Sequence, residues 1–87
     1  MPEPTRDPLL VEREKTHGSF EDNAAISQAI KQIILGSKQV HVMKWTQHEA
    51  LDMIALKMSR ILSGQALTKD HWDDIAGYAK LGSEACD

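Results

Sequence analysis

The chain has 87 residues and contains little cysteine, proline or aromatic residue. Cys86 is the single cysteine, so an intramolecular disulfide and a zinc site built from several thiolates are both excluded. A reducing, cytoplasmic setting is the simplest expectation for such a sequence. The three prolines all lie within the first eight residues, so none interrupts a helix in the remainder of the chain.

Long apolar runs and clusters of positive charge are also missing. No run approaches the roughly 18 apolar residues that a membrane-spanning helix needs, and the opening MPEPTRD lacks the apolar segment of a signal peptide. The formal net charge is −3 and no cluster of Lys and Arg occurs, which argues against nucleic acid as a partner. There is also no Gly-rich phosphate loop, no nucleophile elbow and no pair of histidines with metal-ligand spacing.

The chain does contain apolar residues at helical spacing. Asp7 and Pro8 predict the start of a short helix, which Gly18 would end. A second helix is predicted to open at Ser19 and to end at Gly36, with one apolar stripe along it. That stripe consists of Ile26, Ala29, Ile30, Ile33 and Ile34.

Two more helices follow. Thr46 to Glu49 has the S/T-x-x-E pattern of a capping box, and the apolar stripe after it is centred near Leu51 and Met58. Gly64 would end this third helix, and the last helix would run from Asp70 to Gly82. The connector before the third helix alternates Val40 and Val42, which could form a short extended piece. The expected inner face of the last helix consists of Trp72, Ile75, Ala76 and Ala79.

The sequence therefore predicts an all-α fold, a compact bundle of three main helices plus a short N-terminal helix. Residues 7–82 would form this single domain, after a disordered lead-in at 1–6 and before a frayed tail at 83–87. A chain of this size buries roughly 60–65% of the surface of its unfolded state. We therefore expect part of its apolar surface to be buried between protomers, with a dimer favoured.

Four carboxylates are candidate ligands for Mg²⁺, a hard cation that prefers oxygen. Glu49 and Asp52 lie on neighbouring turns of one helix, and Asp70 and Asp74 share a face of the next. Each pair also has a simpler interpretation. Glu49 could be the capping-box acid with Asp52 solvated, and acids in a first helical turn, Asp70 as N-cap and Asp73 at N3, complement the helix dipole.

Other polar and aromatic residues allow two interpretations. Asn23 points toward the edge of an apolar face, where it could bond a neighbouring backbone group or open onto a ligand site. Tyr78 follows Asp74 by one turn and could share a pocket with it. Trp45 and Trp72 are expected to be core anchors rather than platforms for stacking a ligand.

Four separated blocks of the sequence resemble one family of small domains of unknown function, encoded mainly by bacteriophages and prophages. The resemblance covers Pro8 to Gly82. The blocks are Arg13, Thr16-His17-Gly18-Ser19-Phe20, Lys57-x-x-Arg60 and Asp70-x-x-x-Asp74-Ile-Ala-Gly-Tyr78.

At greater distance the pattern is similar to the MazG-like all-α NTP pyrophosphohydrolases and to small phage domains associated with nucleotide modification. The MazG-like enzymes hold Mg²⁺ with E-x-x-E and E-x-x-D pairs, act as dimers or tetramers and cleave between the α- and β-phosphates of nucleotides. Glu49-x-x-Asp52 resembles the E-x-x-D pair. The chain departs from that pattern because no E-x-x-E pair precedes Glu49.

The resemblance favours a protein that binds a phosphorylated nucleotide, with Mg²⁺-dependent hydrolysis as an extension. In this hypothesis the carboxylates Asp52, Asp70, Asp74 and, more weakly, Glu49 would hold Mg²⁺. The ligand-binding residues would be Arg13, His17, Asn23, Lys57, Arg60 and Tyr78.

The alternative is a non-catalytic phage protein that inhibits a host protein or sequesters a host signalling molecule. In that case Lys57, Arg60 and the acids would form internal salt bridges, and Met43, Trp45 and Met53 would offer an adaptable apolar surface. A third hypothesis is a small bundle whose polar motif only closes its own core.

Overall fold

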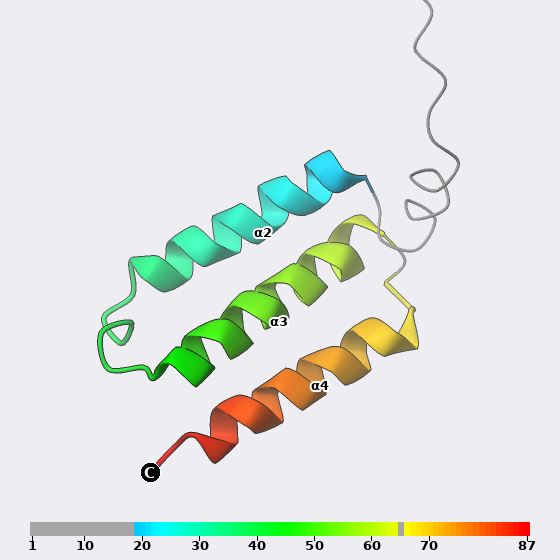
Figure 1. The fold of residues 1–87 in the computed structure, drawn as a ribbon. Helices are drawn as coiled ribbons and strands as arrows, with labels where there is room; N and C mark the ends of the chain where they lie inside the picture. Colours follow the sequence, from blue (N-terminus) through cyan, green and yellow to red (C-terminus); the bar gives the residue numbers. More distant parts are fainter. Residues whose placement is uncertain (1–18, 65) are drawn as a thin grey trace, which may run out of the picture.

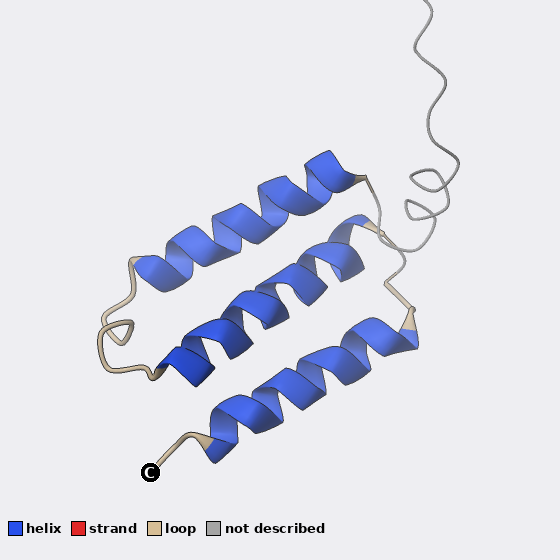
Figure 2. Cartoon of the chain, in the orientation of Figure 1, coloured by secondary structure: helices blue, strands red, loops and turns tan. Residues whose placement is uncertain are grey.

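The computed structural model of the chain describes residues 19–64 and 66–87. Three helices account for most of this part: α2 (Phe20–Leu35), α3 (Trp45–Ser63) and α4 (Lys69–Glu84) (Figure 1). No strand occurs in these two ranges (Figure 2). The predicted all-α fold with three main helices is confirmed. The short helix predicted after Asp7 lies outside the described residues.

The ends of α2 are those that the sequence predicts. The Ser19 hydroxyl accepts a hydrogen bond from the Asp22 N–H at 3.1 Å, and this bond satisfies one of the amides that a helix start leaves unpaired. At the other end the Gly36 N–H donates to the Gln32 carbonyl oxygen at 3.1 Å. Both ends follow from local residue chemistry.

The helix α3 begins one residue before the predicted cap. Lys44 rather than Thr46 is the N-cap, and the Oε1 atom of Gln47 accepts a hydrogen bond from the Lys44 N–H at 3.1 Å. Gln47 thus has the role expected of Glu49. The connector before it is not extended, because the Val42 N–H donates to the Gln39 carbonyl in a turn. After these turns, α3 begins at Trp45, before the predicted cap Thr46.

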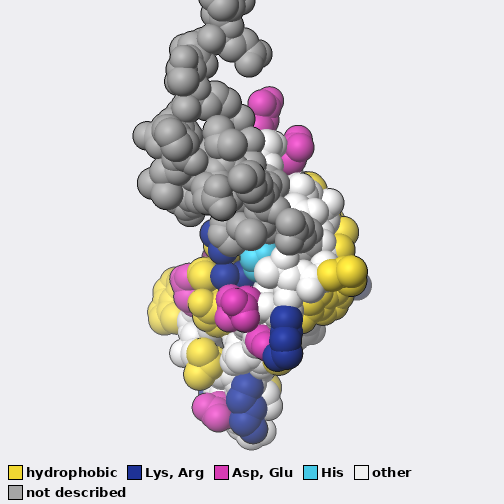
Figure 3. Space-filling view, turned by 90° about the vertical axis from the view of Figure 1, so that its right-hand side faces the viewer, with side chains coloured by type: hydrophobic (Ala, Val, Ile, Leu, Met, Phe, Trp, Pro, Cys, Tyr) yellow, Lys and Arg dark blue, Asp and Glu magenta, His cyan; other side chains and the backbone are white. Residues whose placement is uncertain are grey.

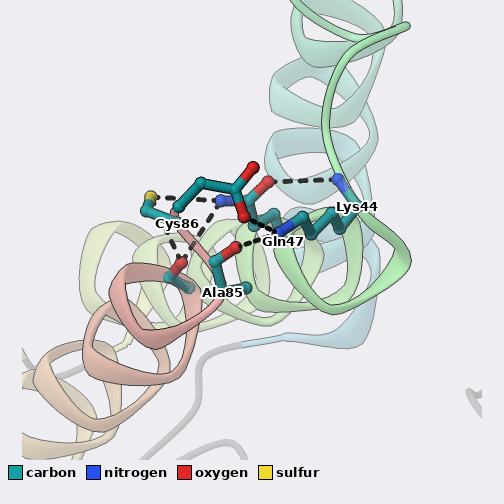
Figure 4. A network of polar contacts seen from close by, with 6 residues as sticks. Lys44, Gln47, Ala85 and Cys86 are labelled. Carbon is teal, nitrogen blue, oxygen red and sulfur yellow. Dashed lines mark hydrogen bonds and ion pairs between the residues drawn. The ribbon is translucent and has the colours of Figure 1, made fainter.

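The helix α4 differs from its prediction at both ends. Thr68 is its N-cap, and the helix continues two residues beyond Gly82. The residues after it contact the start of α3 (Figure 4). Lys44 Nζ donates to the Ala85 carbonyl at 2.6 Å and lies 2.8 Å from Oδ1 of Asp87. These contacts connect the C-terminal end of α4 to the N-terminal end of α3.

The three helices lie side by side with α3 in the middle. It packs against α2 on one side and α4 on the other, and in the described ranges α2 and α4 do not contact each other. Successive helices run in opposite directions (Figure 1). The arrangement is a single layer with two broad faces. One end of the layer contains the start of α2, the end of α3 and the start of α4.

A single layer buries few apolar side chains. Among the described residues the buried apolar ones are Val40, Ala50 and Ala55. Trp45, predicted to anchor the core, is 89% exposed, and Trp72 is 55% exposed with its indole N–H donating to the Ala66 carbonyl at 2.7 Å. The prediction of two tryptophan core anchors is therefore wrong. A helix in one layer buries only the sides that face its neighbours.

Candidate functional site

Five of the ten predicted ligand and metal residues come together at one end of the layer, where α2 and α4 start and α3 ends. Basic, acidic and histidine side chains lie close together at this end (Figure 3). Two predicted ligand residues, Arg13 and His17, lie outside the described residues. We define the polar end as the side chains of the described residues that meet there. It consists of Asn23, Lys57, Ser59, Arg60, Ser63, Asp70, His71 and Asp74.

Asn23 joins α2 to α3 within the polar end. Its Oδ1 atom accepts hydrogen bonds from the hydroxyls of Ser63 at 2.8 Å and Ser59 at 3.4 Å. Its Nδ2 atom donates to the Ser19 carbonyl at 3.0 Å. The amide is buried, and a buried polar group needs such partners because it has lost water. Much of the hydrogen-bonding capacity of Asn23 is therefore used in holding two helices together.

Lys57 and Asp74 join α3 to α4. Lys57 Nζ lies 2.9 Å from Oδ2 of Asp74, and the exposed fractions of the two side chains are 12% and 45%. The ion pair is partly withdrawn from water, so removal of one partner would leave an uncompensated charge on the other. This internal pairing is what the non-catalytic and structural hypotheses predict for these residues.

Arg60 lies one turn after Lys57 on α3 and is half-buried. Within the described part of the chain, no carboxylate is paired with it. A guanidinium offers a planar set of donors that fits a phosphate group in a bidentate manner. Arg60 is therefore the cation of the polar end that is available to an anionic ligand.

The four predicted metal ligands are not assembled into one cluster. Glu49 and Asp52 lie in the first half of α3, whereas Asp70 and Asp74 lie in the first two turns of α4. Because the two helices are antiparallel and Lys57 pairs with Asp74, Asp70 lies level with the end of α3, away from Glu49. Residues 19–64 and 66–87 contain no group of three or more His, Cys, Asp or Glu side chains that could hold a metal ion.

The acidic start of α4 also differs from expectation. Thr68 takes the N-cap position predicted for Asp70, which instead lies in the first turn. Asp73 lies beyond N3 and forms an ion pair with Lys69 one turn earlier. The hydrogen bond from Lys69 to Asp73, and then the charge of Asp73, raise the pKa of the Lys69 ammonium. Asp73 therefore has a local surface partner.

Sequence reasoning missed two residues of the polar end. His71 and Ser59 are both buried, although neither was given a role. His71 precedes Asp74 by three residues, so the two lie near each other on the side of α4 that faces α3. The spacing of His71, Asp74 and the half-buried Tyr78 along α4 is the signal in the sequence that could have placed His71 on this side.

These features define a small all-α domain with one polar end and a small buried apolar core. The chain belongs to the DUF6378 family, a domain of unknown function whose family profile matches residues 5–86. The comparison with curated proteins and the comparison with solved structures each gave no match. None of the helices in the described ranges is long and apolar enough to cross a membrane.

Proposed function

We propose that this domain binds a phosphorylated nucleotide at the polar end. The observation that carries the proposal is Arg60, a half-buried guanidinium without a carboxylate partner among the described residues. It lies one turn from Lys57, whose ammonium adds positive charge while it holds Asp74. Arg60 would contact the phosphate, and Asn23 and Tyr78 would be further ligand residues, as the sequence predicts.

The carboxylates at the starts of α2 and α4 favour a nucleotide that enters as its Mg²⁺ complex. Glu21, Asp22 and Asp70 occupy the first turns of α2 and α4 and offset the positive ends of these helices. A free polyphosphate would be repelled by them. Mg²⁺ is commonly held by one or two carboxylates together with substrate phosphates and waters, so it needs no complete protein cage. Asp70 is the carboxylate that the proposal assigns to this ion.

The proposal is for binding rather than hydrolysis by a single protomer. The pyrophosphohydrolase-like chemistry implied by the MazG-like resemblance needs two acidic pairs around the phosphates. Asp52 and Glu49 lie too far along α3 to join Asp70 and Asp74 in one cluster. The phage origin and the host cytoplasm that the family resemblance implies are part of this proposal.

A titration tests the nucleotide proposal. Wild-type protein is titrated by calorimetry with nucleoside mono- and triphosphates, with and without Mg²⁺, alongside Arg60→Ala and the control Lys80→Ala on the exposed side of α4. We expect wild type and Lys80→Ala to bind alike and Arg60→Ala to lose about tenfold or more in affinity, since a charge-assisted bond contributes about 1.5–3 kcal/mol. Equal affinity of all three proteins, or no binding by wild type, would refute the proposal.

A second candidate function is the non-catalytic binding of a host protein. Trp45 is 89% exposed at the end of the layer opposite the polar end, and the exposed residues Leu35 and Val42 lie at the end of α2 and in the connector before α3. Exposed tryptophans are frequent energetic centres of protein interfaces. Sequence reasoning assigned an adaptable apolar surface to Trp45 with Met43 and Met53, and the exposure of Trp45 favours that assignment.

Capture of host proteins on immobilised domain tests the second candidate. Trp45→Ala should lose a partner that wild type retains, whereas Phe20→Ala, an equally open aromatic position at the polar end, should retain it. Retention of the same partner by both variants would exclude Trp45 as the contact.

A further inference from the structure

The apolar stripe of α3 lies between its two packed sides. The side toward α4 contains Ala50, which lies 3.7 Å from the Cβ position of Gly82, and Lys57, which pairs with Asp74. Consecutive residues of an α-helix are turned by about 100°. The residues that follow these two contacts, Leu51 and Met58, therefore point away from α4 and onto one broad face of the layer.

The apolar stripe of α4 emerges on that same face. His71 and Gly82 mark the side of α4 that packs on α3, and Trp72 directly follows His71. The two helices are antiparallel and face each other. Both helices are right-handed. In each of them, the residue that follows a residue of the α3–α4 contact therefore turns to the same broad face of the layer. Trp72 thus lies on the face that contains Leu51.

The apolar stripe of α2 reaches this face as well. Asn23 marks the side of α2 that packs on α3, and Ile34 lies on the same side three turns later. The helix α2 lies on the other side of α3 from α4, so the order is reversed. In α2, the residue before each residue that contacts α3 turns to this face. Ile33 precedes Ile34 and is exposed. All three stripes therefore share one side of the layer.

We call this side the open face, defined by Ile33, Leu51, Met58, Leu62, Trp72 and Ala79. None of the six carries a charge. By the same rule Asp22, which precedes Asn23, turns to the open face. Glu49 and Asp70 turn to the opposite face, where Leu35 and Leu81 are also exposed. Leu62 is 66% exposed and Trp72 is 55% exposed, so the open face is largely accessible.

We propose that the open face is occupied by a second copy of the chain, so that two layers pack into a six-helix dimer with its core between them. Helices of 16 and 19 residues at a spacing of about 8–10 Å make a face of roughly 600–700 Å², near the roughly 800 Å² per partner of a standard interface. A flat face on which apolar side chains predominate can be complementary to itself about a two-fold axis.

The small number of apolar side chains buried within one protomer also supports a second copy of the chain on the open face. Val40, Ala50 and Ala55 are the buried apolar residues of the described ranges, and two of them are alanines. A layer with so little apolar burial gains little hydrophobic free energy by itself, whereas a second layer would cover Met58 and Leu62. The proposal does not depend on nucleotide binding, because Arg60 turns to the opposite face.

Two matched variants test the dimer. Leu62 on the open face and Leu35 on the opposite face are both 66% exposed, so Leu62→Lys and Leu35→Lys make the same chemical change at equal exposure. The mass in solution is measured by light scattering across the micromolar range. We expect wild type and Leu35→Lys at twice the protomer mass of 9.7 kDa, and Leu62→Lys shifted toward one protomer mass.

A monomeric wild type at every concentration would overturn the proposal and assign the open face to residues 1–18 or to another protein. A dimer that Leu35→Lys breaks and Leu62→Lys leaves intact would overturn it in favour of the opposite face. If Leu62→Lys fails to fold, the melting temperature of wild type decides. It should rise with protein concentration for the proposed dimer, and a constant melting temperature would refute it.

Discussion

Lys57 and Asp74 form a partly buried ion pair, with Nζ and Oδ2 2.9 Å apart, that joins the middle helix to α4. These two residues belong to blocks that the sequence resemblance marked as a ligand site. The ion pair joins two helices, and the proposed function would have the same motif border a ligand site. The predictions below separate these two roles.

The ion pair should contribute to stability. Asp74→Ala leaves the Lys57 ammonium, 12% exposed, without its partner, and we expect a loss of about 1–3 kcal/mol in the free energy of unfolding, the partial exposure of Asp74 reducing the effect. Urea unfolding measures it. The control is Asp73→Ala, which removes an exposed pair and should cost about 0.5 kcal/mol or less. Equal losses in the two variants would contradict a special role for Asp74.

The Asn23 side chain should be needed for packing of α2 on α3. Asn23→Ala removes the acceptor of the Ser63 hydroxyl and the donor to the Ser19 carbonyl, so we expect a loss of about 1–3 kcal/mol. Thermal or urea unfolding measures it. Gln28→Ala on the exposed side of α2 is the control and should change stability by less than about 0.5 kcal/mol. An unaffected Asn23→Ala would show that the hydrogen bonds are dispensable.

Gly77 should be replaceable by alanine with a gain in stability. An added Cβ at this position meets no atom within 4 Å, and the residue lies in the middle of α4. Alanine reduces the conformational entropy of the unfolded chain and has the higher helix propensity, so we expect a gain of about 0.5–1 kcal/mol. A melting temperature that falls instead would show that the position contacts a partner, such as a second copy or a ligand.

The Lys69 ammonium should titrate above its ordinary value of 10.5, because Asp73 stabilises its charged form. A raised pKa means that the stabilising effect is complete below the unfolded-state value and is lost as the pH rises through the folded-state pKa. Nuclear magnetic resonance titration of the Lys69 side chain measures it. In Asp73→Asn we expect the pKa to fall toward the ordinary value, and no change would contradict the assigned cause.

The predictions about helices from the sequence were sound where the signals are local. Ser19 caps α2 and Gly36 ends it as expected, because a hydroxyl or a glycine acts on the turn that it adjoins. The start of α3 was misplaced, because its cap forms two residues earlier than the predicted one and has long-range contacts beside it. Lys44 and Gln47 begin α3 together with contacts to the C-terminal residues, which no pattern around Thr46 contains.

The sequence predicted which residues belong to the candidate site. It did not predict which of them pair with one another. The motif marked Lys57, Arg60 and Asp74 as residues near one another, and the structure brings their helices together. It also shows Lys57 engaged, Arg60 without a carboxylate partner in the described ranges, and Asp52 apart from Asp70. These differences depend on the register between α3 and α4, which is set by packing between distant parts of the chain.

The sequence by itself determined that the chain forms three main helices with apolar stripes, because hydrophobic periodicity and caps act within a few residues. Only the tertiary structure decided which sides of the helices are buried. In a single layer the contacts of α3 involve Ala50, Lys57 and Ser59, while Met58 at the centre of its stripe stays partly exposed. Small and polar residues fit between closely packed helices, so large apolar residues such as Met58, Leu62 and Trp72 are left exposed.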